Sequence, residues 1–232
     1  TWYGGEPLLA FNRIEKLYDR ILAETEKKIV FHSIITNGFL INDRTIDFFK
    51  RSGLNSIQIS FDGTKDNHDQ SRYLKDGHKP TFDTIVANME KLARAMPELR
   101  INARINVNKE NITDFTEMYK MFSDAEWCAK IHVYPGIIHE DSADGATMCS
   151  RCYTERELPE LYELIEKSGI PVNYLPKISN KGCMMQYAES FIIGPEGELY
   201  KCWEDVSKPD RTVGSIMEPE KGDYGLLMRY MH

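Results

Sequence analysis

The sequence lacks several features that would place it in a specialised class of protein. Acidic residues outnumber basic ones by 36 to 29, so the net charge is −7 and no basic surplus exists to cover a nucleic acid. No apolar run approaches the roughly 18 residues of a membrane-spanning helix, and no secretory signal is visible. With 41% hydrophobic and 28% charged residues among 232, the chain has the composition of an ordinary globular protein.

Cysteine is also scarce, with five residues in the whole chain: Cys128, Cys149, Cys152, Cys183 and Cys202. Without a secretory signal, a disulfide framework is a less expected use of them than metal ligation or plain burial. The chain begins with Thr1 rather than Met, and its first residues already lie inside a motif. We therefore expect a fragment of a longer protein.

Strand and helix patterns alternate along the first 170 residues, which predicts a parallel sheet with crossover helices. Helical stripes of apolar residues follow Phe11, Asp43, Phe82 and Ile112, and a capping box of Thr154 with Glu157 opens a helix closed by Gly169. The predicted strands are Ile29–Ile35, Ser56–Phe61, Ile101–Val107 and Lys130–Tyr134. The polar stretch Thr64–Pro80 is expected to be a long loop, which in a compact domain is usually functional or disordered.

The pattern changes after Gly169, and we place a domain boundary near residue 170. Pro171–Ser179 is expected to be extended. Ser190–Ile193 and Glu198–Cys202 flank the turn Gly194-Pro195-Glu196-Gly197, which predicts a β-hairpin.

Turn residues gather directly after the predicted strands, in Gly4-Gly5-Glu6, Thr36-Asn37-Gly38 and Ser60-Phe61-Asp62-Gly63. The carboxyl ends of parallel strands form the active face of an α/β fold, so these three clusters are expected to meet. Glycines allow close backbone approach to a ligand, and the Glu6 carboxylate suits an ammonium group. A Gly-Gly turn before Pro7, taken alone, is more often only a turn.

Polar and apolar residues alternate in Ile57–Phe61 and in Ile101–Val107. Parallel strands that are covered on both faces are nearly all apolar. The polar rows therefore indicate either an open lumen that encloses a polar ligand or edge strands with one wet face. The sequence alone does not separate these two interpretations.

Taken in order, these clusters resemble the barrel of radical SAM enzymes, together with His68-Asp69, Arg72 and Thr81-Phe82. The region from Cys183 through Gly197 to Cys202 resembles the start of the SPASM extension that many of them carry. The resemblance covers essentially the whole chain, and is nearest to the peptide- and protein-modifying branch that includes anaerobic sulfatase-maturating enzymes. It implies a partial (β/α) TIM-type barrel over residues 1–170, followed over 171–232 by a small, hairpin-containing and truncated SPASM start.

The resemblance also implies a role for individual residues in binding S-adenosylmethionine (SAM). Gly4, Gly5 and Glu6 match the motif that holds the methionyl ammonium group. Ser60 matches a strand-end contact to the ribose or carboxylate, and Arg72 matches an arginine whose guanidinium fork suits a carboxylate. Ile137 falls where an apolar residue lies against the adenine. Without the resemblance, Ser60 is a plain turn residue and Arg72 a solvated charge.

Cys183 and Cys202 match the first two ligands of an auxiliary 4Fe-4S cluster, against the alternative of two buried apolar cysteines. The Cys-x3-Cys-x2-Cys motif for the SAM-cleaving 4Fe-4S cluster is absent, as are the later SPASM cysteines. We attribute both absences to truncation, and expect this piece alone to be inactive. In sulfatase-maturating relatives, the residue after this second cysteine is an Asp that acts as the catalytic base. Here Trp203 follows Cys202, which argues against sulfatase maturation and leaves the general base unassigned.

The remaining candidates have simpler interpretations. Cys149 and Cys152 form a Cys-x2-Cys pair, for which metal or redox use is the less expected alternative because no second pair or histidine lies nearby. Cys128, beside Trp127, is expected in the core. His132 is expected to be a satisfied core histidine, with a role beside Arg104 in a lumen as the alternative.

The implied activity of the parent enzyme is reductive cleavage of SAM to methionine and a 5′-deoxyadenosyl radical, which abstracts hydrogen from a peptide or protein substrate. The implied partners are that substrate and a reductant such as flavodoxin or ferredoxin, with no nucleic acid or membrane, and the implied location is the cytoplasm. The first alternative is a cluster-free relative that binds a leader peptide and assists a maturase. The second, a metal-free barrel lyase, lacks a clear catalytic lysine or carboxylate pair.

Overall fold

The computed structural model describes residues 1–26, 28–128, 131–138, 151–170 and 182–231. The chain divides into two compact units, Thr1–Tyr174 and Leu175–His232, each with a sheet of its own. Within the described ranges, no helix combines the length and the apolar character that crossing a bilayer requires. Pro171–Ser179, expected to be extended, lies outside the described residues.

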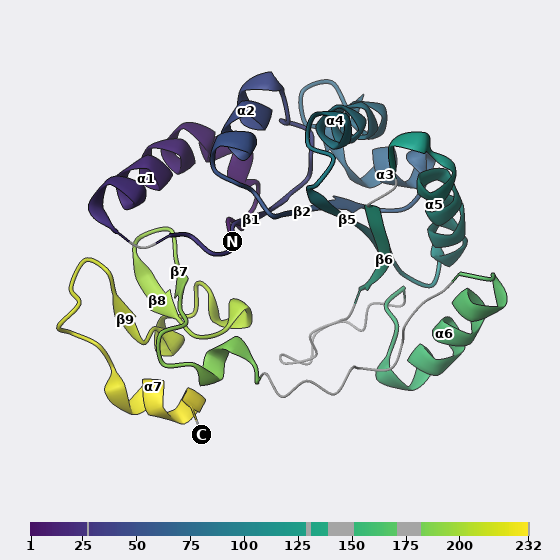
Figure 1. Ribbon diagram of the computed structural model, residues 1–232. Coiled ribbons are helices and arrows are strands. Elements are labelled where there is room, and N and C mark those ends of the chain that lie inside the picture. Colours follow the sequence, from purple (N-terminus) through teal and green to yellow (C-terminus); the bar gives the residue numbers. More distant parts are fainter. Residues whose placement is uncertain (27, 129–130, 139–150, 171–181, 232) are drawn as a thin grey trace. The chain divides into compact units, whose positions relative to one another are not determined.

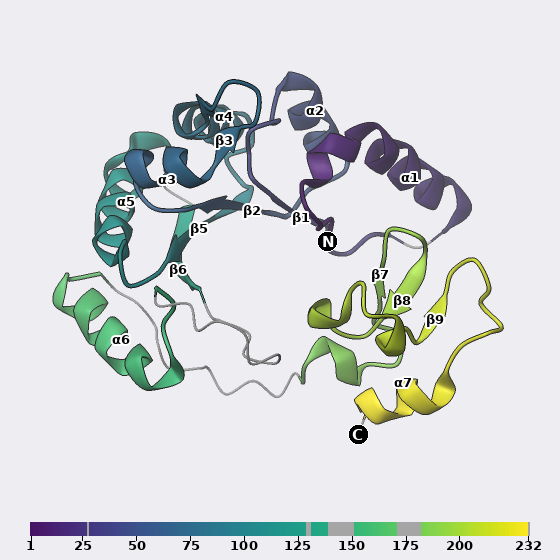
Figure 2. The same cartoon turned by 180° about the vertical axis from the view of Figure 1, so that it is seen from behind.

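The first unit is built on a four-stranded parallel sheet in the order β1-β2-β5-β6. Its strands are β1 (Ser33–Thr36), β2 (Ser56–Phe61), β5 (Arg100–Val107) and β6 (Ile131–Ile137). Its main helices are α1 (Phe11–Glu24), α2 (Asp43–Arg51), α3 (Lys65–Ser71), α4 (Phe82–Ala95), α5 (Ile112–Asp124) and α6 (Leu158–Lys167). Figure 1 shows helices α1, α2, α4 and α5 on the outer side of the curved sheet, and Figure 2 shows the same layer from behind. The alternation and the parallel pairing agree with the predicted partial barrel.

The hydrophobic core lies between this sheet and its helices. The apolar positions of β2 and β5 are at most 2% exposed: Ile57, Ile59, Phe61, Ile101, Ala103, Ile105 and Val107. They pack with residues of the helical layer such as Phe49, Met89 and Phe115, each at most 1% exposed. Because strand side chains alternate between faces, the polar residues of the same strands all lie on the other face.

The edge-strand interpretation of that alternation is wrong. Strands β2 and β5 are both interior strands of the sheet, each paired on two sides. Apart from Arg100, which is exposed, their polar positions are nevertheless half-buried. The polar row is therefore a property of one whole sheet face rather than of an exposed edge.

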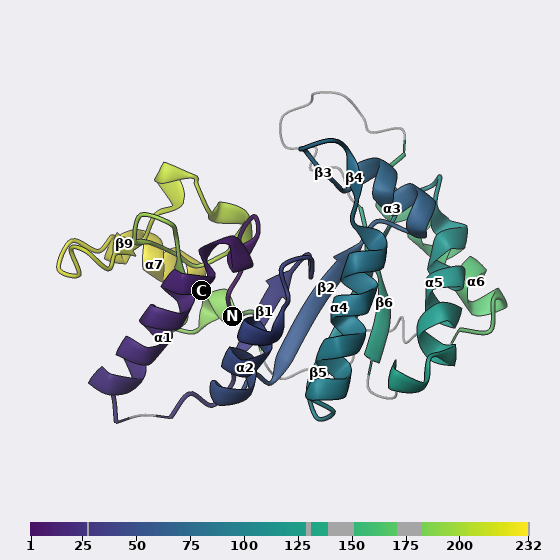
Figure 3. The ribbon, with the colours of Figure 1, turned by 90° about the horizontal axis from the view of Figure 1, so that it is seen from above.

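Two predictions for the strands and loops of the first unit need correction. The first strand begins at Ser33 rather than Ile29, because its partner β2 begins at Ser56, which pairs with Ser33. Val30 and Phe31 are left exposed. The stretch Thr64–Pro80 is not one loop: it holds α3 and a two-stranded antiparallel ribbon of β3 (Tyr73–Leu74) and β4 (Lys79–Pro80). Figure 3 shows α3 and this ribbon beyond the ends toward which the sheet strands point.

The described residues of the first unit also include the short 3-10 helices η1 (Pro7–Ala10), η2 (Glu126–Cys128) and η4 (Glu155–Glu157). The capping box of Thr154 with Glu157 is confirmed, although it opens η4 ahead of α6 rather than α6 itself. Strand β6 runs three residues further than predicted, to Ile137. This extension keeps β6 paired with β5 as far as Val107.

The second unit contains an antiparallel three-stranded sheet in the order β7-β8-β9. The predicted hairpin is formed by β7 (Ile192–Ile193) and β8 (Glu198–Tyr200), and β9 (Gly214–Ser215) adds a third strand. The other elements among the described residues of this unit are η5 (Met184–Gln186), η6 (Trp203–Asp205), η7 (Pro209–Arg211) and α7 (Tyr224–Met231). Gly197 closes the hairpin turn with φ +93°, a backbone conformation that glycine adopts readily because it has no side chain.

Candidate functional site

The Gly-Gly-Glu turn is fastened to the carboxyl end of β1 through the side chain of Glu6. Its Oε1 accepts hydrogen bonds from the Leu8 N–H at 2.9 Å and the Thr36 hydroxyl at 2.7 Å, and its Oε2 accepts from the Asn37 N–H at 2.7 Å. Trp2, just upstream, pairs in parallel with Ile34. The structure thus brings the first two turn clusters into direct contact.

The glycines of this turn leave their backbone accessible. Gly4 and Gly5 are exposed, and a Cβ built on either would have no atom within 4 Å. Gly4 has φ +147°, a conformation that side chains of L-residues disfavour. A ligand could therefore reach this stretch of backbone directly.

The third cluster is held by Asp62, directly after β2. Its carboxylate accepts hydrogen bonds from Arg72 Nε at 2.6 Å, Asn106 Nδ2 at 2.7 Å and the Ser71 hydroxyl at 3.1 Å. Burial opposes ionisation of Asp62, but the bond and charge of Arg72, helped by Asn106 and Ser71, outweigh it and hold its pKa below the ordinary value. The ion pair with Asp62 thus holds the Arg72 guanidinium in position at the carboxyl ends of β2 and β5, and the Arg72 side chain is 33% exposed.

The residues around Arg72 that carry the family resemblance act as its support. His68 is fully buried; its Nδ1 accepts the Asp62 N–H at 3.3 Å, and its Nε2 lies 3.2 Å from the Thr81 hydroxyl. Thr81 in turn donates to the Arg72 carbonyl at 2.5 Å. Asp69 accepts from the backbone N–H groups of Thr81 and Phe82, and so caps the start of α4. Residues 68–82 are therefore held together by side-chain and backbone hydrogen bonds and do not form a loop.

The buried histidine predicts a pH dependence of stability. Burial lowers the pKa of His68 in the folded chain, so the unfolded chain binds the proton first as the pH falls below its own value of about 6.5. We expect unfolding free energy to be full above that pH and to decline below it. In the His68→Gln variant this part of the slope should disappear, measured by urea unfolding between pH 7 and pH 5.

His32 is the internal control for that measurement, because burial also lowers its pKa and it accepts a hydrogen bond from Trp2 Nε1 at 2.7 Å. The His68→Gln variant should keep the His32 share of the slope. An unchanged slope in that variant would show that His68 is not the titrating group.

The polar face of the sheet, defined by Gln58, Ser60, Asn102, Arg104, Asn106, His132 and Tyr134, lies below these strand ends. The Tyr134 hydroxyl donates to Gln58 Oε1 at 2.7 Å across the intervening strand β5. Ser60 is the register partner of Arg104, which in turn is the register partner of Tyr134. Ser60, Arg104 and Tyr134 are all half-buried.

Ile137 and His132 lie on β6, at different depths. Ile137 is the last residue of β6, half-buried and paired with Val107, so it lies at the same end of the sheet as Asp62 and Asn106. His132 is exposed and stacks on Tyr134 with ring centroids 5.5 Å apart. The core interpretation of His132 is therefore wrong, and it belongs to the polar face with Arg104.

In the second unit, Cys183 and Cys202 are both free thiols, the first exposed and the second half-buried. Cys183 precedes η5 and Cys202 follows β8. Lys201 links the two regions: it is fully buried, and its Nζ donates to the carbonyls of Tyr187 and, at 2.7 Å, Ser190. Its ammonium also lies 4.8 Å from the centre of the Phe191 ring, and burial lowers its pKa.

We therefore expect Lys201 to keep the segment that follows Cys183 in an ordered conformation. In the Lys201→Met variant both carbonyls lose a charged donor, so we expect amide deuterium uptake across residues 184–190 to rise by about tenfold or more in rate. Lys208→Met, at an exposed position, is the matched control and should leave that uptake unchanged. Equal protection in both variants would mean that Lys201 does not hold the segment.

The other cysteines add no metal site to the described part of the chain. Among those residues, no group of three or more His, Cys, Asp or Glu side chains is placed to hold a metal ion. Cys152 is buried and disulfide-bonded, a use of cysteine that was the less expected one from the sequence. Cys149 and the side chain of Cys128 lie outside the described residues.

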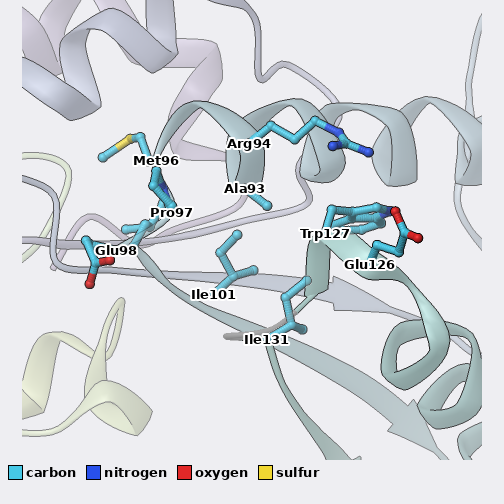
Figure 4. Close-up of a pocket in the computed structure, with 10 residues that line it drawn as sticks. Ala93, Arg94, Met96, Pro97, Glu98, Ile101, Glu126, Trp127 and Ile131 are labelled. Atoms are coloured by element: carbon cyan, nitrogen blue, oxygen red, sulfur yellow. The ribbon is translucent and has the colours of Figure 1, made fainter.

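A pocket of about 310 Å³ lies at the opposite end of the sheet from the candidate site. Figure 4 shows its lining, which comes from the end of α4, from η2 and from the first residues of β5 and β6, including Met96, Ile101, Trp127 and Ile131. The amino ends of parallel strands serve stability rather than chemistry in this class of fold. None of the predicted site residues lines this pocket.

Sequence reasoning missed several residues that shape the site. Asp62 was predicted only as part of a turn, and Asn106 only as part of a polar row, yet they join the ends of β2 and β5. Asp114 was not singled out, although its Oδ2 accepts three hydrogen bonds from Thr64 and Asn67 just after the same turn. The available signal was the position of each polar residue at a strand end or helix start.

Comparison with known proteins gives the family context of this site. A family profile described as the Radical SAM superfamily matches residues 1–122. The chain is 34% identical over 134 residues to a cysteine-type anaerobic sulfatase-maturating enzyme of Clostridium novyi, which covers 55% of this chain and 33% of that protein. It is 30% identical over 125 residues to the radical SAM cyclopropyl synthase TigE of Paramaledivibacter caminithermalis, covering 52% of this chain and 25% of that protein. The matches thus span a third or less of these curated relatives.

Two solved structures share the fold. Native anSMEcpe with bound AdoMet has a TM-score of 0.69 at 18% identity, covering 99% of this chain and 66% of that one. Streptococcus suis SuiB bound to the precursor peptide SuiA has a TM-score of 0.59 at 16% identity, covering 96% of this chain and 54% of that one. At these identities the likeness shows the fold alone.

Proposed function

The chain belongs to the radical SAM superfamily, and we propose that its parent protein uses SAM to begin a radical modification of a peptide or protein substrate. The observation that carries this proposal is the Glu6 carboxylate, which joins the Gly-Gly-Glu turn to Thr36 and Asn37. This contact places an accessible glycine backbone and a carboxylate at the strand-end face of the sheet. The Asp62–Arg72 pair adds a cation at the ends of β2 and β5.

The residues present fit the methionine part of SAM. A carboxylate has about four acceptor positions, and Glu6 uses three of them, so one remains for an ammonium group. Arg72 bonds Asp62 through Nε, and a guanidinium has further N–H donors suited to a carboxylate. We assign Gly4, Gly5 and Glu6 to the ammonium group, Ser60 to the ribose or carboxylate, Arg72 to the carboxylate, and Ile137 to the adenine.

The residues of this chain do not fit the catalytic 4Fe-4S cluster, since the sequence contains no Cys-x3-Cys-x2-Cys motif. We propose that Cys183 and Cys202 contribute to an auxiliary cluster of a SPASM domain that begins near residue 171. Two thiols are half of the four ligands such a cluster takes.

The role of this chain is to bind and orient. In the family, SAM with a reduced cluster supplies hydrogen-abstraction chemistry, and the protein supplies position and exclusion of water. His68, Asp69 and Thr81 hold the backbone of Arg72 in place, and Asn106 holds the Asp62 carboxylate that pairs with Arg72. These contacts fix the cation before any ligand arrives, which reduces the ordering cost of binding.

A peptide or protein substrate is supported by the kinds of relative that the chain matches. One is named a sulfatase-maturating enzyme, and another structure is bound to a precursor peptide. Sulfatase maturation itself is not favoured, because Trp203 directly follows Cys202. A low-potential reductant such as flavodoxin or ferredoxin would supply the electron.

The test is the iron and sulfide content, with an anaerobic absorption spectrum, of the protein made from the complete reading frame. The proposal predicts iron and sulfide at the level of at least one 4Fe-4S cluster per chain. A full-length, anaerobically prepared protein without iron would overturn it. That result would favour the alternative of a cluster-free, peptide-binding partner of a maturase.

A further inference from the structure

Arg104 lies in the middle of the polar face and is not used by the contacts described above. It belongs to the interior strand β5, with Ser60 beside it on β2 and Tyr134 beside it on β6. Its side chain is half-buried. It is one register level deeper than Asn106, which bonds Asp62 at the strand ends.

The guanidinium of Arg104 has an unmet hydrogen-bonding requirement. Its Nε is buried and has no hydrogen-bond partner among the residues that the structure describes. Arg104 takes part in none of the ion pairs found among the same residues. A buried polar group without a partner is costly, and a buried charge more so. Such a group is retained at a cost unless a ligand satisfies it.

The position of Arg104 depends on a glycine. A Cβ at Gly136 would lie 2.2 Å from Arg104 Nε and 2.8 Å from its Cγ, so any other residue on β6 at this point would displace the arginine. The absence of a side chain at position 136 therefore gives the guanidinium its place against β6. This is the close approach for which glycine in a strand is suited.

The neighbouring polar groups cannot neutralise this cation. Gln58 accepts the Tyr134 hydroxyl, and Asn102 donates to Ser56; all four are uncharged near neutral pH. Asp62, the acidic group at the nearby strand ends, already accepts three hydrogen bonds and pairs with Arg72. One uncompensated guanidinium among neutral donors and acceptors suits a single carboxylate better than a multiply charged phosphate.

We propose that Arg104 binds a carboxylate on the polar face of the sheet, through its guanidinium fork, and that this carboxylate belongs to the substrate. An acidic side chain or the carboxyl terminus of a peptide has the required chemistry. The methionyl carboxylate of SAM is the second source of the same chemistry, although Arg72 at the strand ends is already assigned to it. The identity of the substrate as a peptide rests on the proposed function, whereas the carboxylate site does not.

The test follows the Nε–Hε resonance of Arg104 by NMR in the full chain labelled with 15N-arginine, and identifies it by its loss in Arg104→Gln. Sodium acetate is the probe, and acetamide, its neutral analogue, is the control. We expect acetate to shift this resonance saturably and acetamide to leave it unchanged. Arg100→Gln, at an exposed position on the same strand, should keep the response.

Gly136→Ala is the second variant, because its methyl group displaces the guanidinium without removing the charge, although it would also lie 2.8 Å from Asn106 Oδ1. We expect its acetate affinity to fall by about tenfold or more, since a charged hydrogen bond is lost. Equal responses to acetate and acetamide in the unaltered chain would overturn the proposal, whether or not either variant folds. So would a saturable acetate shift that Gly136→Ala retains in a folded protein.

Two further titrations separate the sources of the carboxylate. If the substrate supplies it, acetate should still shift the Arg104 resonance when SAM is saturating. If SAM supplies it, SAM should abolish the acetate response, and decarboxylated SAM should not; this would support the carboxylate site and reassign its source. Failure of the proposed function would appear as a protein without iron that still shows the acetate response.

Discussion

Gly63→Ala is expected to lower the free energy of unfolding by about 4 kcal/mol. Gly63 has φ +99°, where an alanine is strained. A Cβ here would lie 2.2 Å from Asp114 Oδ2, the atom that accepts from the Thr64 N–H, the Thr64 hydroxyl and Asn67. The methyl group must therefore displace a carboxylate that orders the start of α3.

Urea unfolding followed by circular dichroism measures this loss, and Gly77→Ala is its control. Gly77 also has a positive φ, +74°, but the atom nearest to a methyl group at this position would be Lys79 Cε, 3.7 Å away. We expect Gly77→Ala to cost only about 1 kcal/mol, which is the strain of the backbone conformation alone. Equal losses in the two variants would show that the Asp114 contact does not stabilise this turn.

Glu6→Gln is expected to weaken SAM binding by about tenfold or more and to destabilise the fold by about 2 kcal/mol. The glutamine amide nitrogen cannot accept a hydrogen bond, so whichever way it points it faces the Asn37 N–H or the Leu8 N–H and Thr36 hydroxyl. The change also removes the charge assigned to the ammonium group. Both effects share one cause, because the same carboxylate holds the turn and would bind the ligand.

Calorimetric titration of SAM into the full-length protein measures the first effect, and urea unfolding the second. Glu24→Gln removes an exposed carboxylate on α1 whose partner is Arg20, one helical turn away. It should change neither quantity measurably, as is typical of exposed ion pairs. If Glu6→Gln behaves like Glu24→Gln, the carboxylate neither fastens the turn nor contributes to the ligand site.

The parts of the fold that the sequence predicts well are those with a periodic signal. Alternating apolar residues in Ser56–Phe61 and Arg100–Val107 became two buried strands with a polar opposite face. The spacing of apolar residues in Phe82–Ala95 and Ile112–Asp124 became helices that cover the sheet. Burial of one face makes apolar residues recur at a fixed spacing along a strand or helix, and this spacing can be recognised in the sequence.

The parts that sequence reasoning missed are held by contacts between distant residues. Thr64–Pro80 is too polar to show a helical stripe, yet α3 forms there. Asp114, 50 residues beyond Thr64, accepts hydrogen bonds from the backbone N–H and the hydroxyl of Thr64, the residue just before this helix. Nothing in the sequence indicates that Lys201 is fully buried. Its burial is possible because the carbonyls of residues 187 and 190 accept hydrogen bonds from its ammonium group. A hydrogen bond to a distant residue leaves no local pattern.

The site is intermediate between these cases. The positions of its residues at strand ends follow from the turn signals, whereas their contacts do not. Glu6 was expected to serve a ligand, and the structure shows it also fastening two turns together. Arg72 was expected to be exposed without the resemblance, and Asp62 instead holds it as a half-buried ion pair.

The most direct test of the central claim is the product of SAM under reduction. The protein from the complete reading frame is prepared anaerobically, given SAM and dithionite, and analysed for 5′-deoxyadenosine by liquid chromatography. Our account predicts 5′-deoxyadenosine that depends on the reductant and falls sharply in Glu6→Gln. Intact SAM after prolonged reduction, in a protein with its full complement of iron, would contradict it.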